Sequence, residues 1–149
     1  MEVLVAILVL AIGLLGLAAL QARGLKFNHD AYARTQATYL AYEIIDLLRA
    51  NEASAKDYVS TGHPGGTCDP KGSSPKGDLA CWYDTVQAVL PAGNARVQGN
   101  GQQFDITIGW QERSAREPRT AGECTEVPSR EWDARSRLCR VVQTWTVRL

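Results

Sequence analysis

The chain has 149 residues, enough for one domain and an N-terminal anchor. Its sixteen basic and sixteen acidic side chains balance, and the arginine excess toward the C-terminus is too small to predict a nucleic-acid-binding patch. The four cysteines contain no CxxC pair and the two histidines complete no zinc pattern, so we expect no metal site.

The first element is an apolar segment, Val3 to Leu20, which has no charge and no proline. A helix of eighteen residues is the lower limit for spanning a hydrocarbon core about 30 Å thick, so the segment is a candidate membrane span. A secretory signal peptide usually has a shorter apolar core behind a basic stretch. Here Glu2 comes first and the helical pattern continues past Leu20. A carboxylate in the first turn also favours a helix start through the macrodipole, which is the simplest explanation of Glu2.

The helical period continues to Asn51, which predicts one helix about 75 Å long from Glu2 to Asn51. A domain of this size cannot bury such a helix, so its first half must project. The second half is amphipathic, and we expect its apolar stripe to pack on the globular part while His29 stays solvated. The expected stripe is Leu25, Tyr32, Tyr39, Leu40, Ile44, Leu47 and Leu48, and the other faces carry Arg23, Lys26, Asp30, Arg34, Glu43, Asp46 and Arg49.

Two glycines, Gly13 and Gly16, interrupt the apolar half of this helix. Each costs about 1 kcal/mol relative to alanine, which marks a place where the helix can bend or unwind. Close packing against another helix in the membrane is an equally good explanation.

The residues from Asn51 to Lys76 are rich in glycine and proline and predict a loop. A short helix follows, with Asp78 as its expected cap and Pro91 with Gly93 at its end. Its expected apolar face is Leu79, Trp82, Val86, Val89 and Leu90.

Two strands follow a glycine turn at residues 99–101. The first is indicated by Phe104, Ile106, Ile108 and Trp110, which alternate with other residues, and the second runs from about Leu138 to Leu149. The apolar face of the second strand is Val141, Trp145, Val147 and Leu149. The connection between these strands is long and polar, and we expect a staple to hold it.

An even number of cysteines beyond a membrane segment indicates disulfides and an oxidising compartment. Four cysteines permit three pairings, of which the simplest joins sequence neighbours. We therefore predict Cys68–Cys81 and Cys124–Cys139.

Catalytic patterns are not found in the sequence: there is no phosphate loop and no nucleophile elbow. His63 lies in a glycine-rich loop without a base pattern nearby, and strand geometry does not obviously bring Asp105 and Glu112 together. We expect a non-enzymatic protein without a cofactor, in which the apolar helix lies in a membrane or packs against the helices of sister subunits.

The opening stretch EVLVAILVLAIGLLGLAALQ resembles the start of PilV-type minor pilins of the type IV pilin superfamily. A looser resemblance extends through CWYDTVQAVLPAGNARV and FDITIGW to VVQTWTVRL. It implies an α+β fold in which a long N-terminal helix with a protruding apolar half packs on a small antiparallel sheet. Residues 1–24 would be the transmembrane and assembly half, and residues 25–149 the disulfide-stapled periplasmic head.

The resemblance also implies a function, a minor pilin that primes type IV pilus assembly and sits in the pilus tip complex. Glu2 matches the glutamate thought to meet the amino terminus of a neighbouring subunit during docking. The implied partners are other minor pilins and the major pilin, through the N-terminal helix, together with a tip adhesin. The implied location is the bacterial inner membrane before assembly, as a single-pass protein with a periplasmic head, and afterwards the pilus tip.

The sequence departs from the family pattern in two places. Met1 directly precedes Glu2, whereas the family has a basic leader, a glycine and a hydrophobic residue there, so no peptidase site is assigned and we expect those residues to be missing from this sequence. Without them, Arg23 and Lys26 are the basic flank, on the side opposite to that given by the positive-inside rule. The helix also has no proline, so Gly13 and Gly16 are the expected sites of flexibility.

Two alternatives remain open at this point. A minor pseudopilin of a type II secretion system has the same helix and differs mainly in the system that it serves. A membrane-anchored periplasmic binding module would never polymerise, and would copurify with a ligand and not with sister pilins.

Overall fold

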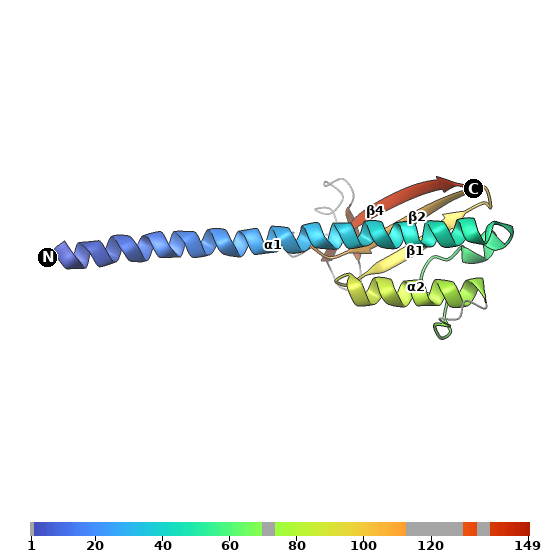
Figure 1. Ribbon diagram of the computed structural model, residues 1–149, viewed down its shortest axis with the longest axis horizontal. Coiled ribbons are helices and arrows are strands. Elements are labelled where there is room, and N and C mark those ends of the chain that lie inside the picture. Colours follow the sequence, from blue (N-terminus) through green and yellow to red (C-terminus); the bar gives the residue numbers. More distant parts are fainter. Residues whose placement is uncertain (1, 70–73, 113–129, 134–137) are drawn as a thin grey trace.

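The computed structural model describes residues 2–69, 74–112, 130–133 and 138–149, and it gives residues 130–133 and 138–140 by their backbone. The protein is an α+β protein with a single long helix, α1 (Glu2–Ala50), that extends far beyond a small head (Figure 1). At about 1.5 Å per residue its 49 residues measure about 73 Å, so the predicted projecting helix is confirmed.

The second half of α1 packs on the described part of the head, partly through small side chains. Its buried residues begin at Asp30 and continue through three alanines spaced four apart to larger aliphatic side chains. Residues three and four apart share one face of a helix, and alanine lets the neighbouring elements approach closely. The buried face is Asp30, Ala33, Ala37, Leu40, Ala41, Ile44, Ile45 and Leu48.

The stripe predicted from the sequence is therefore correct only toward its C-terminal end. Leu25, Tyr32 and Tyr39 are 70, 61 and 66% exposed, because they lie on the face of α1 that points away from the head. Asp30, expected on a solvated face, is buried, and His29 is half-buried where solvation was expected.

The loop expected after α1 contains a short 3-10 helix, η1 (Glu52–Tyr58), so that part of the prediction is wrong. The second helix, α2 (Pro75–Val89), starts earlier than predicted. Its cap is Ser74, whose hydroxyl accepts a hydrogen bond from the Gly77 backbone N–H, and Asp78 lies inside the first turn instead. Pro75 fits the first helical turn because it needs no N–H partner there.

Within the described residues, four antiparallel strands form one sheet in the order β1-β2-β4-β3. Their bounds are β1 (Asn94–Gly99), β2 (Gln103–Trp110), β3 (Arg130–Asp133) and β4 (Leu138–Arg148). The predicted turn joins β1 to β2, and Gly101 adopts a φ of +95° there, which favours glycine. Strands β1 and β3 were not predicted from the sequence, and β3 lies within the long polar connection for which only a staple was expected.

The core lies between the sheet, the second half of α1 and α2 (Figure 1). Strand β2 supplies its centre: the four apolar side chains predicted to alternate along this strand are completely buried. Val147 is also buried, and the other predicted apolar side chains of β4 pack against the core while partly exposed. On α2, Val89 of the predicted apolar face is instead exposed, and the rest of that face is buried or, for Leu90, buried just beyond the helix end.

Candidate functional site

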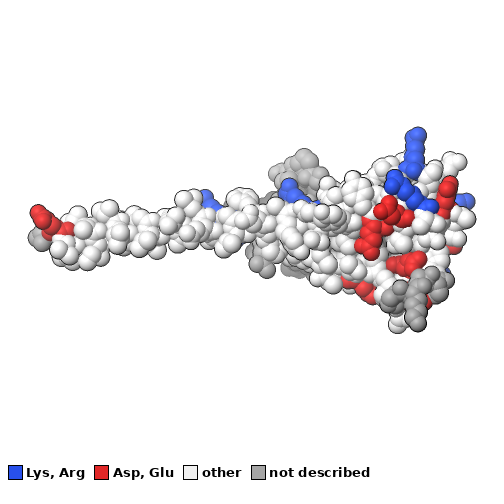
Figure 2. Space-filling model, in the orientation of Figure 1, with Lys and Arg blue, Asp and Glu red and all other residues white. Residues whose placement is uncertain are grey.

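The most prominent surface of the protein is the projecting half of α1, a slender rod with few charged side chains in the space-filling view (Figure 2). Every residue from Glu2 to Asn28 is exposed. Large aliphatic side chains between Val3 and Leu20 are 53–71% exposed. The helix is long and apolar enough to cross a membrane, and none of its most apolar window is buried by the head. A continuous apolar surface of this extent marks a membrane or protein interface.

Glu2 lies in the first turn of α1, at the end farthest from the head. It shares one helix face with Val5, Ala6 and Val9, with which it lines a shallow open hollow. An ionised side chain here is favoured by the partial positive charge of the helix N-terminus. No ion pair to Glu2 is found among the described residues, so a positively charged partner would have to come from another molecule or from the part of the chain that is not described.

Both predicted flexibility sites, Gly13 and Gly16, are helical in the structure. A Cβ atom added at either glycine would meet nothing within 4 Å. Packing within this chain therefore does not require glycine at these positions. The two explanations from the sequence, flexibility and close contact with another helix, both remain predictions.

An ion pair fastens α1 to the end of strand β2. The guanidinium Nε of Arg34 donates to the Glu112 carboxylate over 2.7 Å, and the two side chains are 61 and 3% exposed respectively. The hydrogen bond to Glu112, and then its negative charge, raise the pKa of Arg34 above its usual value, with a smaller contribution from Asp30. No sequence pattern indicates this pair, because 78 residues separate its members.

A second polar cluster joins the end of α1 to α2 through Tyr58. The side-chain amide of Asn51 donates to the Tyr58 hydroxyl over 3.1 Å, and that hydroxyl donates to the Asp78 carboxylate over 3.0 Å. Burial, followed by the bond to Asp78, raises the pKa of Tyr58 to about 12. Asp78, expected to be a helix cap, instead holds η1 against α2.

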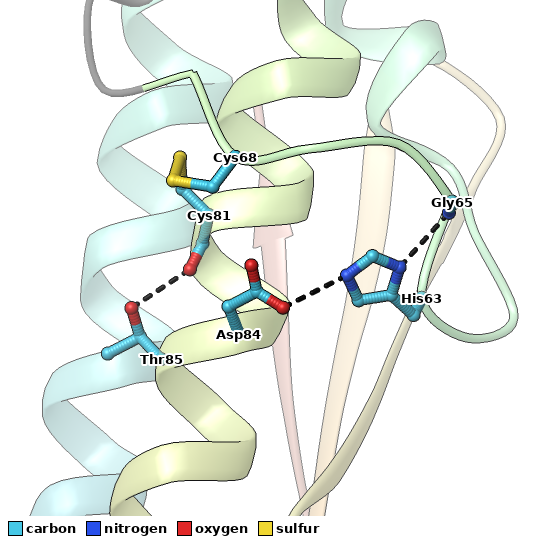
Figure 3. A network of polar contacts seen from close by, with 6 residues as sticks. All are labelled: His63, Gly65, Cys68, Cys81, Asp84 and Thr85. Atoms are coloured by element: carbon cyan, nitrogen blue, oxygen red, sulfur yellow. Dashed lines mark hydrogen bonds and ion pairs between the residues drawn. A yellow bond between two sulfur atoms is a disulfide. The ribbon is translucent and has the colours of Figure 1, made fainter.

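The predicted disulfide Cys68–Cys81 is present and ties the loop after η1 to α2 (Figure 3). The same loop is held a second time by His63, whose Nε2–H donates to Asp84 on α2 over 3.2 Å. Its other nitrogen, Nδ1, accepts from the Gly65 backbone N–H over 3.0 Å. Both ring nitrogens are therefore engaged in holding the loop. The other predicted disulfide, Cys124–Cys139, lies outside the described side chains.

Asp105 and Glu112, the two acidic residues considered in the sequence, have different partners in the structure. Asp105 accepts a hydrogen bond from the Thr146 hydroxyl over 2.7 Å, across the β2–β4 pair, whereas Glu112 binds Arg34. In the described ranges, no three His, Cys, Asp or Glu side chains are grouped closely enough to hold a metal ion. The polar clusters of the described head thus bind its own elements to one another.

These features define a class of protein: an α+β head carried on a long N-terminal helix whose apolar half is exposed and long enough to span a membrane. The chain matches no protein-family model, no curated protein and no solved structure.

Proposed function

We propose that this protein is a minor pilin, a structural subunit that helps to prime a type IV pilus and occupies its tip complex. The observation that carries the proposal is the division of α1 into two halves. One half forms the core of a folded head, and the other has an apolar surface on every side. A subunit with this design can be held in a lipid bilayer first and can later exchange lipid for the helices of neighbouring subunits.

The layout of the head supports the same proposal. A small antiparallel sheet packs on the second half of the long helix, and a disulfide ties a surface loop to α2. The disulfide fits an oxidising compartment such as the periplasm. The resemblance of the opening residues to PilV-type minor pilins adds the expectation that the partners are other minor pilins and the major pilin.

Glu2 is the residue through which the proposal is tested. If its carboxylate only favours the helix start, Glu2→Ala costs a few tenths of a kcal/mol and leaves insertion and function intact. If it pairs with a positive group on a neighbouring subunit in a helix bundle, its removal leaves that group unpaired, at a cost of several kcal/mol. The proposal expects the second result, a protein that inserts and folds but primes pili poorly.

The experiment counts surface pili on cells whose only copy, expressed with its leader, carries Glu2→Ala. Ala6→Ser is the matched control, because Ala6 shares the face of Glu2 but carries no charge. Membrane levels of both variants must equal that of the wild type. Normal piliation with Glu2→Ala would contradict the docking role of Glu2, and normal piliation in cells lacking the gene would contradict the role in pili altogether.

A further inference from the structure

The junction between the apolar half of α1 and the head carries a small basic surface. Arg23 and Lys26 are both exposed, and Phe27 beside them is 65% exposed. Figure 2 shows one basic side chain on the slender part of the helix and another where the helix meets the head. Between Glu2 and Glu43 the helix has one acidic residue, Asp30, and it is buried. The junction therefore presents positive charge that no exposed acid of the same helix segment offsets.

These side chains share one side of α1. Residues three and four apart lie on the same helix face, which places Lys26 and Phe27 beside Arg23. Continuing the helical repeat of 3.6 residues per turn brings this face into line with Ala37 and Ala41, which are buried against the head. The basic surface thus lies on the side of the helix from which the head projects, in the corner between the two.

Helix length places this corner at the surface of a bilayer. The apolar run from Val3 to Leu20 covers about 27 Å, close to the hydrocarbon thickness of about 30 Å. Arg23 then lies about 4.5 Å beyond Leu20 and Lys26 about 9 Å beyond it. Side chains on a helix point toward its N-terminus, which here is toward the membrane, so both cationic groups can reach the headgroup layer.

We propose that Arg23 and Lys26 form a headgroup-binding collar, which holds anionic phospholipids in the corner between α1 and the head. Phe27 lies beside them, and its exposed ring can enter the boundary between headgroups and acyl chains. The head, whose packing on α1 begins at His29, then rests directly above the headgroups. The collar rests on the proposed membrane-anchored state. Lipid binding would explain why Arg23 and Lys26 lie on the side of the span where the positive-inside rule does not expect basic residues.

The test uses the full chain in bilayer nanodiscs that contain equal amounts of phosphatidylglycerol and phosphatidylcholine. Native mass spectrometry after release from the nanodisc measures the ratio of the two lipids retained on the protein. Each basic residue near a charged membrane surface contributes about fivefold. The variant R23Q/K26Q is therefore expected to lose up to about 25-fold in its preference for phosphatidylglycerol, and R23K is expected to keep it.

The matched control is R49Q/K56Q, which also removes two exposed positive charges, one in the last turn of α1 and one in η1, more than twenty residues beyond Lys26. Its lipid preference is expected to equal that of the wild type. An unchanged preference in R23Q/K26Q, or an equal loss in both double variants, would overturn the collar. Failure of the wild-type chain to float with the bilayer would instead contradict the membrane anchor. A normal pilus count in cells lacking the gene would contradict the role in pili and would leave the lipid-binding result unchanged.

Discussion

The indole Nε1–H of Trp82 donates a hydrogen bond of 2.8 Å to the backbone carbonyl oxygen of Leu40. The bond is buried and joins α2 to the middle of the second half of α1, across 42 residues of sequence. Trp82 also contacts Tyr83 edge-on, with their ring centroids 5.1 Å apart. It therefore connects the two helices by both packing and polar contact.

Replacing Trp82 by phenylalanine is expected to lower the free energy of unfolding by about 2 kcal/mol. The variant loses a buried hydrogen bond worth about 1 kcal/mol and leaves a small cavity where the larger ring was. Urea unfolding of the wild type and the variant, followed by far-ultraviolet dichroism, measures the difference. The exposed Val89→Ala on the same helix is the control, and an equal loss in the two variants would contradict the role given to Trp82.

A fragment of residues 25–149 is expected to be a soluble, folded monomer. Residues 2–24, which it lacks, are all exposed and contribute nothing to the described core, whereas the buried face of α1 begins at Asp30 and is retained. Sedimentation and near-ultraviolet dichroism measure the outcome. Aggregation together with loss of the aromatic dichroism would mean that the apolar half belongs to the folded head.

Arg34→Gln is expected to destabilise that fragment by about 1–2 kcal/mol. Loss of the guanidinium leaves the buried Glu112 carboxylate without its charge partner, although the exposure of Arg34 keeps the cost below the 3–5 kcal/mol typical of fully buried pairs. Arg49→Gln breaks only a surface pair with Asp46 and should cost no more than about 0.5 kcal/mol. Equal unfolding midpoints in denaturant for the two variants would argue against a structural role of the Arg34–Glu112 pair.

Stability is expected to fall as the pH rises from about 10 to 12. Tyr58 and Tyr83 each have a pKa of about 12 in the folded protein, raised chiefly by burial above the ordinary tyrosine value of 10. Their stabilising effect is complete below pH 10, and it is lost at higher pH because the unfolded chain releases the phenolic protons first. The slope is at most about 1.4 kcal/mol per pH unit for each tyrosine. Unfolding titrations at several pH values measure it, and Y83F should reduce the slope; an unchanged slope in that variant would count against Tyr83.

Cys68–Cys81 is expected to stabilise the head by about 2–3 kcal/mol, since it closes a short loop over 13 residues of sequence. A C68S/C81S double variant compared with the oxidised fragment measures this. Non-reducing peptide mapping of the same material tests the Cys124–Cys139 pairing, which stays a prediction. A peptide that joins Cys81 to Cys124 would contradict both pairings.

The sequence predicted those elements whose periodicity is long or strict. The helix α1 follows from an unbroken apolar and then amphipathic period, and β2 follows from alternation that ends at Trp110. Strand β1 was missed because NARVQG contains few apolar residues, and its place in the sheet comes from pairing with β2. Strand β3 lies within a polar stretch, and among the described strands its one partner is β4.

The buried face of α1 was assigned in part to the wrong residues because large side chains dominate a search for apolar stripes. Ala33 and Ala37 carry little hydrophobic signal, yet the head approaches α1 closely because they are small. The disulfide Cys68–Cys81 was predicted, but the polar contacts between elements could not be: no local pattern links His63 to Asp84 or Arg34 to Glu112. These contacts depend on how distant segments meet in the folded chain.

The placement of the head along α1 also has a mechanical consequence. The helix runs without a break from Glu2 through the head. A pulling force on its projecting end therefore acts parallel to the interface between the second half of α1 and the head. The Arg34–Glu112 pair, the alanine face and the Trp82–Leu40 bond are spread along that surface and share the load at the same time. A force along the helix axis therefore has to break all of these contacts together, because it does not load them one after another.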